Sequence, residues 1–203
     1  MQSLVFVLVA FLLGCNEFMV VGVISNIAKS YHASLSTVGL LVTIFAITYA
    51  ICTPILTTIT SKYDRFKVLM VMLAIFWVGN TMTALAPSLP WLFISRIITA
   101  AVAGTIISLI LVFVSVIAPL EKRSMLVAAV FSGFSTATII GVPIGTTISM
   151  LSSWHISFLV ISVLTILIGA GLYWLVPRGT KQVTGSIKSQ LRLMTDRRIA
   201  LMA

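Results

Sequence analysis

Two ionisable residues stand inside long apolar stretches of this sequence. Glu17 lies in FLLGCNEFMVVGV, residues 11–23, and Arg96 lies in LFISRIITAAVAG, residues 92–104. A charge deep in a membrane costs about 3 kcal/mol or more unless it is paired or hydrated, so such residues often carry function. Glu17 is a candidate proton carrier or site for a cationic substrate; the alternative is a neutral acid that hydrogen-bonds to a neighbouring helix.

A third unusual stretch, residues 125–151, contains Gly133, Gly141, Pro143 and Gly145. Gly141 and Gly145 form a small-xxx-small pair that allows close helix contact. Pro143 removes one backbone hydrogen bond and can bend the helix. The stretch is therefore a candidate gate, with simple packing as the alternative.

The composition indicates a membrane protein. Of the 203 residues, 60% are hydrophobic and 8% are charged, whereas soluble domains are about a quarter charged. The net charge of +9 would suggest nucleic acid in a soluble protein, but here the basic residues lie between apolar runs. Cys15 and Cys52 lie inside such runs, so we expect no disulfide.

Six runs have the length of about 20 apolar residues that a membrane-spanning helix needs. The sequence therefore predicts an all-α membrane protein, with short joints that carry Pro, Ser and charge. The predicted spans are 4–27, 35–60, 68–86, 91–118, 125–151 and 156–176.

Basic residues alternate between the two sides of these spans. Of the odd-numbered joints, only the first holds a basic residue, Lys29, and this pattern predicts that both ends of the chain are cytoplasmic. The cytoplasmic basic residues are Lys62, Arg65 and Lys67, then Lys122 and Arg123, then Arg178, Lys181, Lys188, Arg192, Arg197 and Arg198.

This orientation places both buried ionisable residues in the outer half of the membrane. With 1.5 Å per residue, Glu17 lies roughly 15 Å and Arg96 roughly 7 Å below the outer surface. We expect the two to be electrostatically coupled if their helices face each other. The alternative is that Arg96 extends to the outer headgroups.

An internal repeat relates the two halves of the chain. ICTPILTTI, residues 51–59, and IGVPIGTTI, residues 140–148, agree at six positions. The same offset relates the first three spans to the last three, which run in the opposite direction. The sequence therefore predicts two inverted three-helix repeats, as in many secondary transporters.

Several polar residues are weaker candidates. His155, next to Trp154, could handle protons or anchor the chain at the interface. Four others could line a cavity or hydrogen-bond between helices: Asn16, Asn26, Tyr49 and Asn80.

Enzyme classes fit poorly. The string nearest to an intramembrane serine protease motif is AVFSG, residues 129–133, with Val130 where glycine is needed and His155 at the outer surface. The two His and two Cys residues are scattered, so we expect no metal site, no cofactor and no catalysis.

Together these stretches resemble the major facilitator superfamily, in particular its twelve-span drug and sugar efflux proteins of the proton-antiport type. GCNEFMVVGVISNIA is similar to the family's first helix, with its membrane acid at Glu17, although the family often has Pro where Ser25 stands. LVTIFAITYAICTPIL resembles the second helix. LFISRIITAAVAG matches the span-four arginine motif, which implies a coupling role for Arg96. GFSTATIIGVPIGT resembles the span-five antiporter motif, and this resemblance implies a role in antiport for its glycines and Pro143.

The joint SKYDRFK departs from the family pattern. Without a gap, Ser61 stands at the family's Asp; with a gap, Asp64 and Arg65 fall on its Asp-Arg pair. The resemblance therefore does not carry over an inner-gate salt bridge. Lys62, Asp64, Arg65 and Lys67 remain the candidate residues of this cytoplasmic loop.

The resemblance also implies a domain division. Residues 1–176 would form the N-terminal six-helix bundle, residues 177–198 a basic central cytoplasmic loop, and residues 199–203 the start of a truncated seventh helix. The C-terminal six-helix half would then be a missing partner, alongside the lipid bilayer.

The function that this implies is secondary transport: proton-coupled efflux of a small organic compound, such as a drug, sugar or nucleobase, across a bacterial plasma membrane. Small-molecule substrate and protons would be the partners, with no nucleic acid. The alternative is a six-span channel or self-assembling small transporter that is complete at this length.

Overall fold

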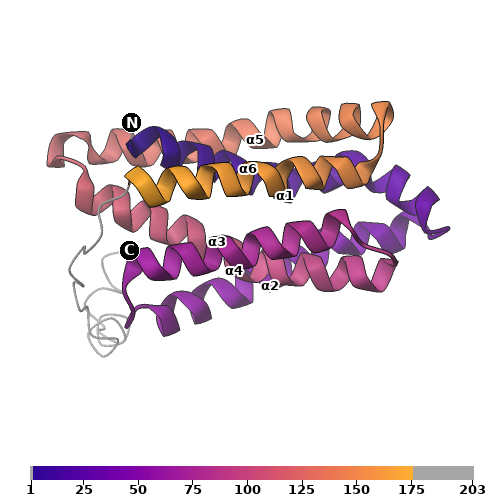
Figure 1. Cartoon of the computed structure of the whole chain (residues 1–203), viewed down its shortest axis with the longest axis horizontal. Helices are drawn as coiled ribbons and strands as arrows, with labels where there is room; N and C mark the ends of the chain where they lie inside the picture. The colour runs from indigo at the N-terminus through magenta and orange to yellow at the C-terminus, as the bar shows by residue number, and fades with distance from the viewer. Residues whose placement is uncertain (1, 176–203) are drawn as a thin grey trace, which may run out of the picture.

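A computed structural model of the chain describes residues 2–175, and all the regular structure in that range is helical. Each of the six long helices is long and apolar enough to cross a membrane, which confirms the predicted spans. A short 3-10 turn, η1 (Leu120–Lys122), precedes the fifth. The helices are α1 (Gln2–Ser30), α2 (Leu35–Thr60), α3 (Arg65–Ala84), α4 (Leu89–Ile117), α5 (Arg123–Leu151) and α6 (Trp154–Leu175) (Figure 1).

Polar residues in the joints determine where the helices begin. The Ser34 hydroxyl accepts a hydrogen bond from the Thr37 backbone N–H (3.0 Å) at the start of α2. The Asp64 carboxylate accepts one from the Lys67 backbone N–H (2.9 Å) at the start of α3. These caps satisfy backbone donors that have no partner inside the helix. The chain can therefore reverse direction within a few residues.

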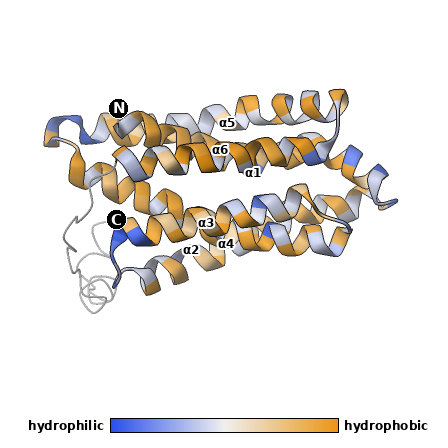
Figure 2. Ribbon diagram, viewed as in Figure 1, coloured by the Kyte–Doolittle hydropathy of each residue, from blue (hydrophilic) through white to orange (hydrophobic). Residues whose placement is uncertain are grey.

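Successive helices run in opposite directions along the bundle (Figure 1). The start of α1, the α2–α3 joint and the α4–α5 joint lie at one end, and the other joints lie at the opposite end. The basic joints 61–67 and 119–123 therefore share one end, while the middle of the bundle is mostly apolar (Figure 2). The predicted central loop and seventh helix, together with residue 176, lie outside the described residues.

The helix packing follows the inverted repeat. α1 packs against α5, and the equivalent pair α4 and α2 also packs; α6 lies on α1 as α3 lies on α4. One individual contact also corresponds. Gly141 of α5 meets Cys15 of α1, and 89 residues away on each helix Gly104 of α4 meets Thr53, beside Cys52, of α2. The glycine has changed sides of the contact, but the two contacts lie at corresponding places in the repeat.

Four small residues at every fourth position of α5 form its contact with α1. Gly133, Ala137, Gly141 and Gly145 are all buried, and a Cβ atom on Gly133 would lie 2.7 Å from the Val7 carbonyl oxygen. Pro143, in contrast, is exposed on another side of the helix. The small-xxx-small pair thus makes a close helix contact, as the packing interpretation expects, while its role as a gate stays a prediction.

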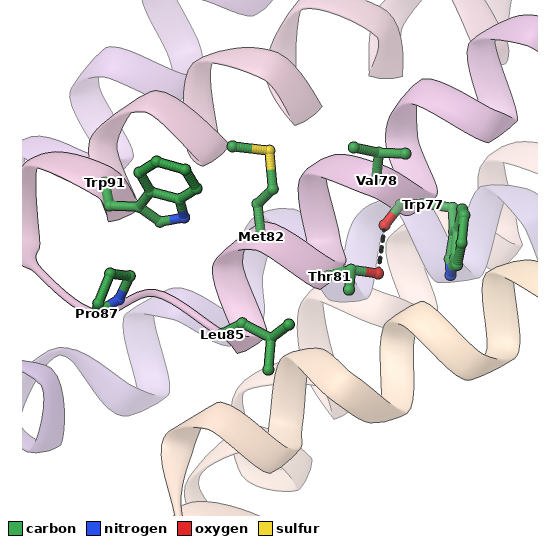
Figure 3. Close-up of a pocket in the computed structure, with 7 residues that line it drawn as sticks. All are labelled: Trp77, Val78, Thr81, Met82, Leu85, Pro87 and Trp91. Carbon is green, nitrogen blue, oxygen red and sulfur yellow. Dashed lines mark hydrogen bonds between the residues drawn. The ribbon is translucent and has the colours of Figure 1, made fainter.

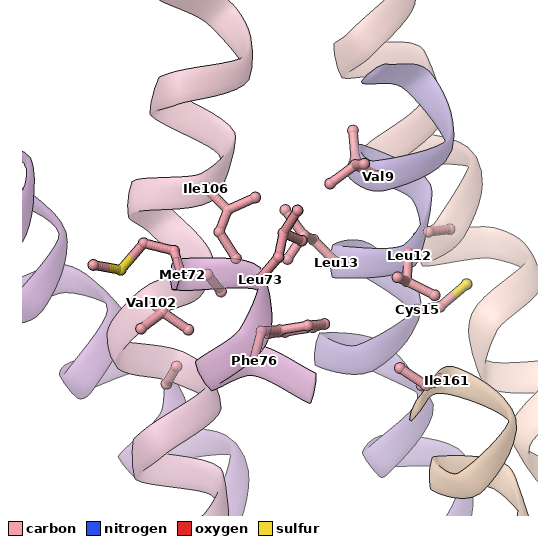
Figure 4. Packing of buried hydrophobic residues seen from close by; sticks show 14 of the residues in the cluster. Val9, Leu12, Leu13, Cys15, Met72, Leu73, Phe76, Val102, Ile106 and Ile161 are labelled. Carbon is pink, nitrogen blue, oxygen red and sulfur yellow. The ribbon is translucent and has the colours of Figure 1, made fainter. Parts of the chain in front are cut away.

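Large side chains from α1, α3, α4 and α6 fill the centre of the bundle. Leu13 of α1, Phe76 of α3, Ile106 of α4 and Ile161 of α6 are among its buried members (Figure 4). α2 and α5 contribute less, and their outward residues remain exposed. On α2 these residues recur every fourth position: Ile47, Ile51, Ile55 and Ile59 are each about half exposed. Such apolar faces need lipid or protein to cover them.

We expect Gly133→Ala to destabilise the bundle, because the new Cβ atom would overlap the Val7 backbone. Overpacking of this kind costs about 1–3 kcal/mol. The matched control is Gly169→Ala on α6, where a Cβ atom meets no atom within 4 Å. Thermal unfolding of the complete gene product in detergent measures both. Equal melting temperatures for the two variants would contradict the close α1–α5 contact.

Candidate functional site

The most unusual side chain in the structure is Arg96 of α4, which has no exposed surface. Its guanidinium carbon lies 4.4 Å from the centre of the Phe45 ring and 5.8 Å from the centre of the Phe158 ring. These contacts are cation–π interactions, worth about 2 kcal/mol when desolvated. The alternative in which Arg96 extends to the outer headgroups is therefore wrong: the guanidinium is buried among helices instead.

A hydrogen-bonded chain of amides holds this guanidinium. Nη1 of Arg96 donates to the backbone oxygen (3.0 Å) and to the side-chain Oδ1 (2.5 Å) of Asn16. Nδ2 of Asn16 donates to Oδ1 of Asn80 (2.8 Å), and Nδ2 of Asn80 donates to the Phe76 carbonyl (2.8 Å). α4, α1 and α3 are thus joined at one buried point. Asn16 and Asn80 act here as polar links between helices.

Glu17 follows Asn16 on α1 and is half-buried. Its carboxyl group interacts electrostatically with Arg96 of α4 and with Tyr49 of α2. Among the described residues it has no hydrogen bond and no ion pair, so the bond to a neighbouring helix that the alternative interpretation requires is not present. The structure therefore brings Glu17 and Arg96 close together without joining them.

The predicted small residues of α5 lie next to this network. Gly141 packs against Cys15, the residue before Asn16. Movement of α5 against α1 would therefore act directly on the residues that hold Arg96.

The predicted loop residues are far from the network, at the end of the bundle opposite the α3–α4 joint (Figure 1). Asp64 caps α3 through the Lys67 backbone N–H, and Arg65 is the first residue of that helix. Lys62 and Lys67 are exposed. The observed function of Asp64 is thus to start α3.

At the opposite end, aromatic side chains tie three helices together. The Tyr31 hydroxyl donates to the Ala86 carbonyl (2.7 Å), and Nε1 of Trp154 donates to the Ser30 hydroxyl (3.1 Å). Burial raises the pKa of the Tyr31 hydroxyl, which favours its protonated, hydrogen-bond-donating form. His155 stacks on Trp154 at 3.6 Å, and its Nδ1 lies 2.8 Å from the Ala84 carbonyl. These contacts match the anchoring interpretation of His155.

Two further contacts support α1. Asn26 donates to the Ser149 hydroxyl of α5, and the Thr146 hydroxyl donates to the Gly22 carbonyl (3.1 Å). Asn26 is therefore a link between helices, ten residues away from Asn16 along α1.

An apolar groove of about 350 Å³ lies on α3 and the start of α4 (Figure 3). It contains neither Glu17 nor Arg96, and none of its lining residues is charged. It therefore differs from the candidate site at Glu17 that the sequence predicts. The lining residues are Trp77, Val78, Thr81, Met82, Leu85, Pro87 and Trp91.

Sequence reasoning did not identify the two rings that flank Arg96. Phe45 and Phe158 are two of 11 phenylalanines in the chain, and nothing in their local sequence distinguishes them. Asn16 had a usable signal, since it is a polar residue in an apolar span directly before the acid. Its contact with Arg96 depends on how α1 and α4 cross, which the sequence does not report.

Comparison with known proteins gives consistent results. The family model described as Major Facilitator Superfamily matches residues 6–202. Uncharacterized MFS-type transporter YfhI of Bacillus subtilis (strain 168) is 35% identical over 184 residues, which are 90% of this chain and 46% of that protein. Inner membrane transport protein YdhP of Escherichia coli (strain K12) is 30% identical over 185 residues, 91% of this chain and 48% of that protein. The chain spans about half the length of these relatives.

Solved structures show the same fold. The proton:xylose symporter XylE superposes with a TM-score of 0.78 at 18% identity, over 99% of this chain and 50% of that one. A bacterial homologue of the human lysosomal transporter Spinster, inward-facing and unoccupied, gives a TM-score of 0.75 at 16% identity, over 93% of this chain and 46% of that one.

We expect Asn80→Leu to destabilise the bundle, because it leaves Nδ2 of Asn16 buried without an acceptor. An unsatisfied buried donor costs about 1–3 kcal/mol. The control is Thr60→Val, which removes a hydroxyl that bonds only to carbonyls of its own helix. Thermal unfolding in detergent measures the difference. A melting temperature for Asn80→Leu equal to that of Thr60→Val would show that the amide chain contributes little.

Proposed function

Because the chain belongs to the major facilitator superfamily, we propose that it forms the N-terminal six-helix part of a proton-coupled exporter of a small organic compound. The observation that carries this proposal is the pair of Glu17 and Arg96: an acid with no hydrogen-bond partner in the described part of the chain, beside a fully buried guanidinium. Both lie within helices that are apolar enough to cross a membrane.

The chemistry of the pair suits proton exchange. When Glu17 is ionised, the positive charge of Arg96 stabilises it, and when Glu17 is protonated this attraction is lost. Proton binding therefore changes the electrostatic force between α1 and α4. A substrate that binds more tightly to one of the two states is driven by the proton gradient, since coupling between two sites is reciprocal.

A second six-helix half would complete the transport path. The half-exposed isoleucines of α2 and the exposed side of α5 around Pro143 are surfaces that such a half could cover. Substrate would then bind between the halves near the middle of the membrane, and α5 would move against α1 during transport.

The proposed location is the bacterial plasma membrane, with the basic end of the bundle in the cytoplasm. This orientation is supported by the position of Lys62, Arg65, Lys67, Lys122 and Arg123 at one end. Positive joints are retained on the cytoplasmic side.

Cysteine labelling tests this orientation. In complete gene product with Cys15 and Cys52 replaced by alanine, we expect a membrane-impermeant maleimide to label Ser88→Cys in intact cells. Tyr63→Cys, at the basic end, should react only after the cells are permeabilised, because the reagent cannot reach the cytoplasm. Both positions are exposed. The reverse pattern would place the basic end outside.

Transport in everted membrane vesicles tests the coupling. A dye that reports the pH gradient is followed while candidate compounds are added: ethidium, chloramphenicol, a sugar and a nucleobase. We expect at least one compound to release protons from wild-type vesicles, and Glu17→Gln to abolish the release, because glutamine cannot exchange a proton. The proposal is wrong if Glu17→Gln behaves as the wild type.

The matched control for this experiment is Glu121→Gln. Glu121 is an exposed acid in η1, in the α4–α5 joint, so its loss removes the same charge without touching Arg96. We expect its proton release to equal that of the wild type. Equal losses in both variants would indicate a general effect of charge rather than a role of Glu17.

A further inference from the structure

The guanidinium of Arg96 is only partly satisfied. Nη1 makes both of its hydrogen bonds to Asn16, while Nε and Nη2 are buried and have no hydrogen-bond partner within residues 2–175. Buried donors that belong to a charged group are costly when left unpaired. The free atoms are therefore expected to have a partner in another state of the molecule.

The two free nitrogens form one edge of the guanidinium. Nε and Nη2 carry parallel N–H groups, and this fork matches the two oxygens of a carboxylate. Asn16 occupies only the third nitrogen. Asn16 and a carboxylate could therefore bind Arg96 at the same time without competing.

The carboxylate that is available is Glu17. It follows Asn16 on α1, about 100° around the helix, and interacts electrostatically with Arg96. The other titratable group that acts on it is Tyr49 of α2. The middle parts of α3, α5 and α6 carry no titratable side chain in the sequence. A rotamer change of Glu17 that brings its oxygens to the free edge would leave the bonds of Asn16 to Nη1 in place.

The orientation of the Asn16 amide is determined by its neighbours. The Phe76 carbonyl accepts from Nδ2 of Asn80, so Oδ1 of Asn80 faces Asn16 and accepts from its Nδ2. Oδ1 of Asn16 is then the atom that faces Arg96. This chain of donors and acceptors directs an oxygen at Nη1. Phe45 and Phe158 lie against the guanidinium as well.

We infer that Asn16 is a positioning residue that binds Nη1 of Arg96 and thereby presents the Nε–Nη2 edge to the ionised carboxylate of Glu17. This inference rests on the proposed function, because it assigns to Asn16 the orientation of the proposed coupling pair. Asn16 does not exchange a proton itself. Its loss would leave both charges in place but let the guanidinium turn away from Glu17.

Carboxyl-selective labelling tests the inference without requiring a substrate. Dicyclohexylcarbodiimide reacts with protonated carboxyl groups in apolar surroundings, and mass spectrometry of the complete gene product in membranes reports the labelled fraction of Glu17. In Asn16→Ala, Arg96 stabilises ionised Glu17 less well, so more Glu17 is protonated. We expect labelling at neutral pH to rise about fivefold or more, the lower end of the range for coupled sites.

The matched control is Asn26→Ala. Asn26 lies on the same helix and also bonds to a neighbouring helix, at Ser149, but it does not contact Arg96. We expect its labelling to equal that of the wild type. An equal rise in both variants, which a loosening of α1 would produce, overturns the inference. An unchanged labelled fraction of Glu17 in Asn16→Ala overturns it as well.

A double-mutant cycle separates positioning from structural damage. In an Arg96→Leu background there is no guanidinium to position, so Asn16→Ala should then have no effect on the labelling rate. A persistent effect overturns the inference. If Asn16→Ala does not accumulate in membranes, Asn16→Ser takes its place, with the same expected direction.

The labelling result and the transport result can fail separately. If Glu17→Gln transports normally while Asn16→Ala still raises labelling, Asn16 positions Arg96 but the pair does not drive transport. If Glu17→Gln abolishes transport while labelling is unchanged in Asn16→Ala, Glu17 remains the coupling acid and the role of Asn16 is wrong.

Discussion

The burial of one guanidinium group is the constraint around which this bundle is organised. Arg96 has no exposed surface, and a membrane offers no water to stabilise a charge at that depth. The protein supplies partners instead: the Asn16 amide of α1, itself held by Asn80 of α3, and phenyl rings from α2 and α6. Side chains of α1, α2 and α6 therefore contact Arg96 of α4, and α3 is connected to it through Asn16. A shift of any one of them changes the surroundings of the charge.

Close packing of α1 against α5 also supports the residues around Arg96. Small residues recur every fourth position along α5, and Cys15 touches Gly141 next to the residue that binds Arg96. In a membrane, helices gain little from burying apolar surface and associate through close contact and hydrogen bonds. The glycine contact and the amide chain are thus complementary: one brings the helices together, and the other determines their rotation. α1 carries both contacts as well as Glu17.

The repeat explains why the bundle has this shape. α1 on α5 and α4 on α2 are equivalent pairs, and the contact of Gly141 with Cys15 corresponds to that of Gly104 with Thr53, beside Cys52. The two repeats have nevertheless diverged in chemistry. α1 and α4 are equivalent helices of the two repeats, but α1 carries the acidic residue Glu17 and α4 the basic residue Arg96. Membership of the major facilitator superfamily agrees with this architecture. Apolar side chains remain exposed on α2 and α5, and these are the surfaces that the proposed second half would cover.

The sequence by itself determined the number of helices, their limits to within three residues and the inverted repeat, because apolar length and breaking residues are local properties. It also identified Glu17, Arg96 and the glycines of α5, since their types are unusual in such surroundings. The tertiary structure alone decided what Arg96 touches. Snorkelling and burial are both compatible with its position in the span, and the choice depends on which helices surround it. The rotation of α1 relative to α4 determines that Arg96 binds Asn16 and not Glu17. That rotation depends on contacts between residues 80 positions apart in the sequence.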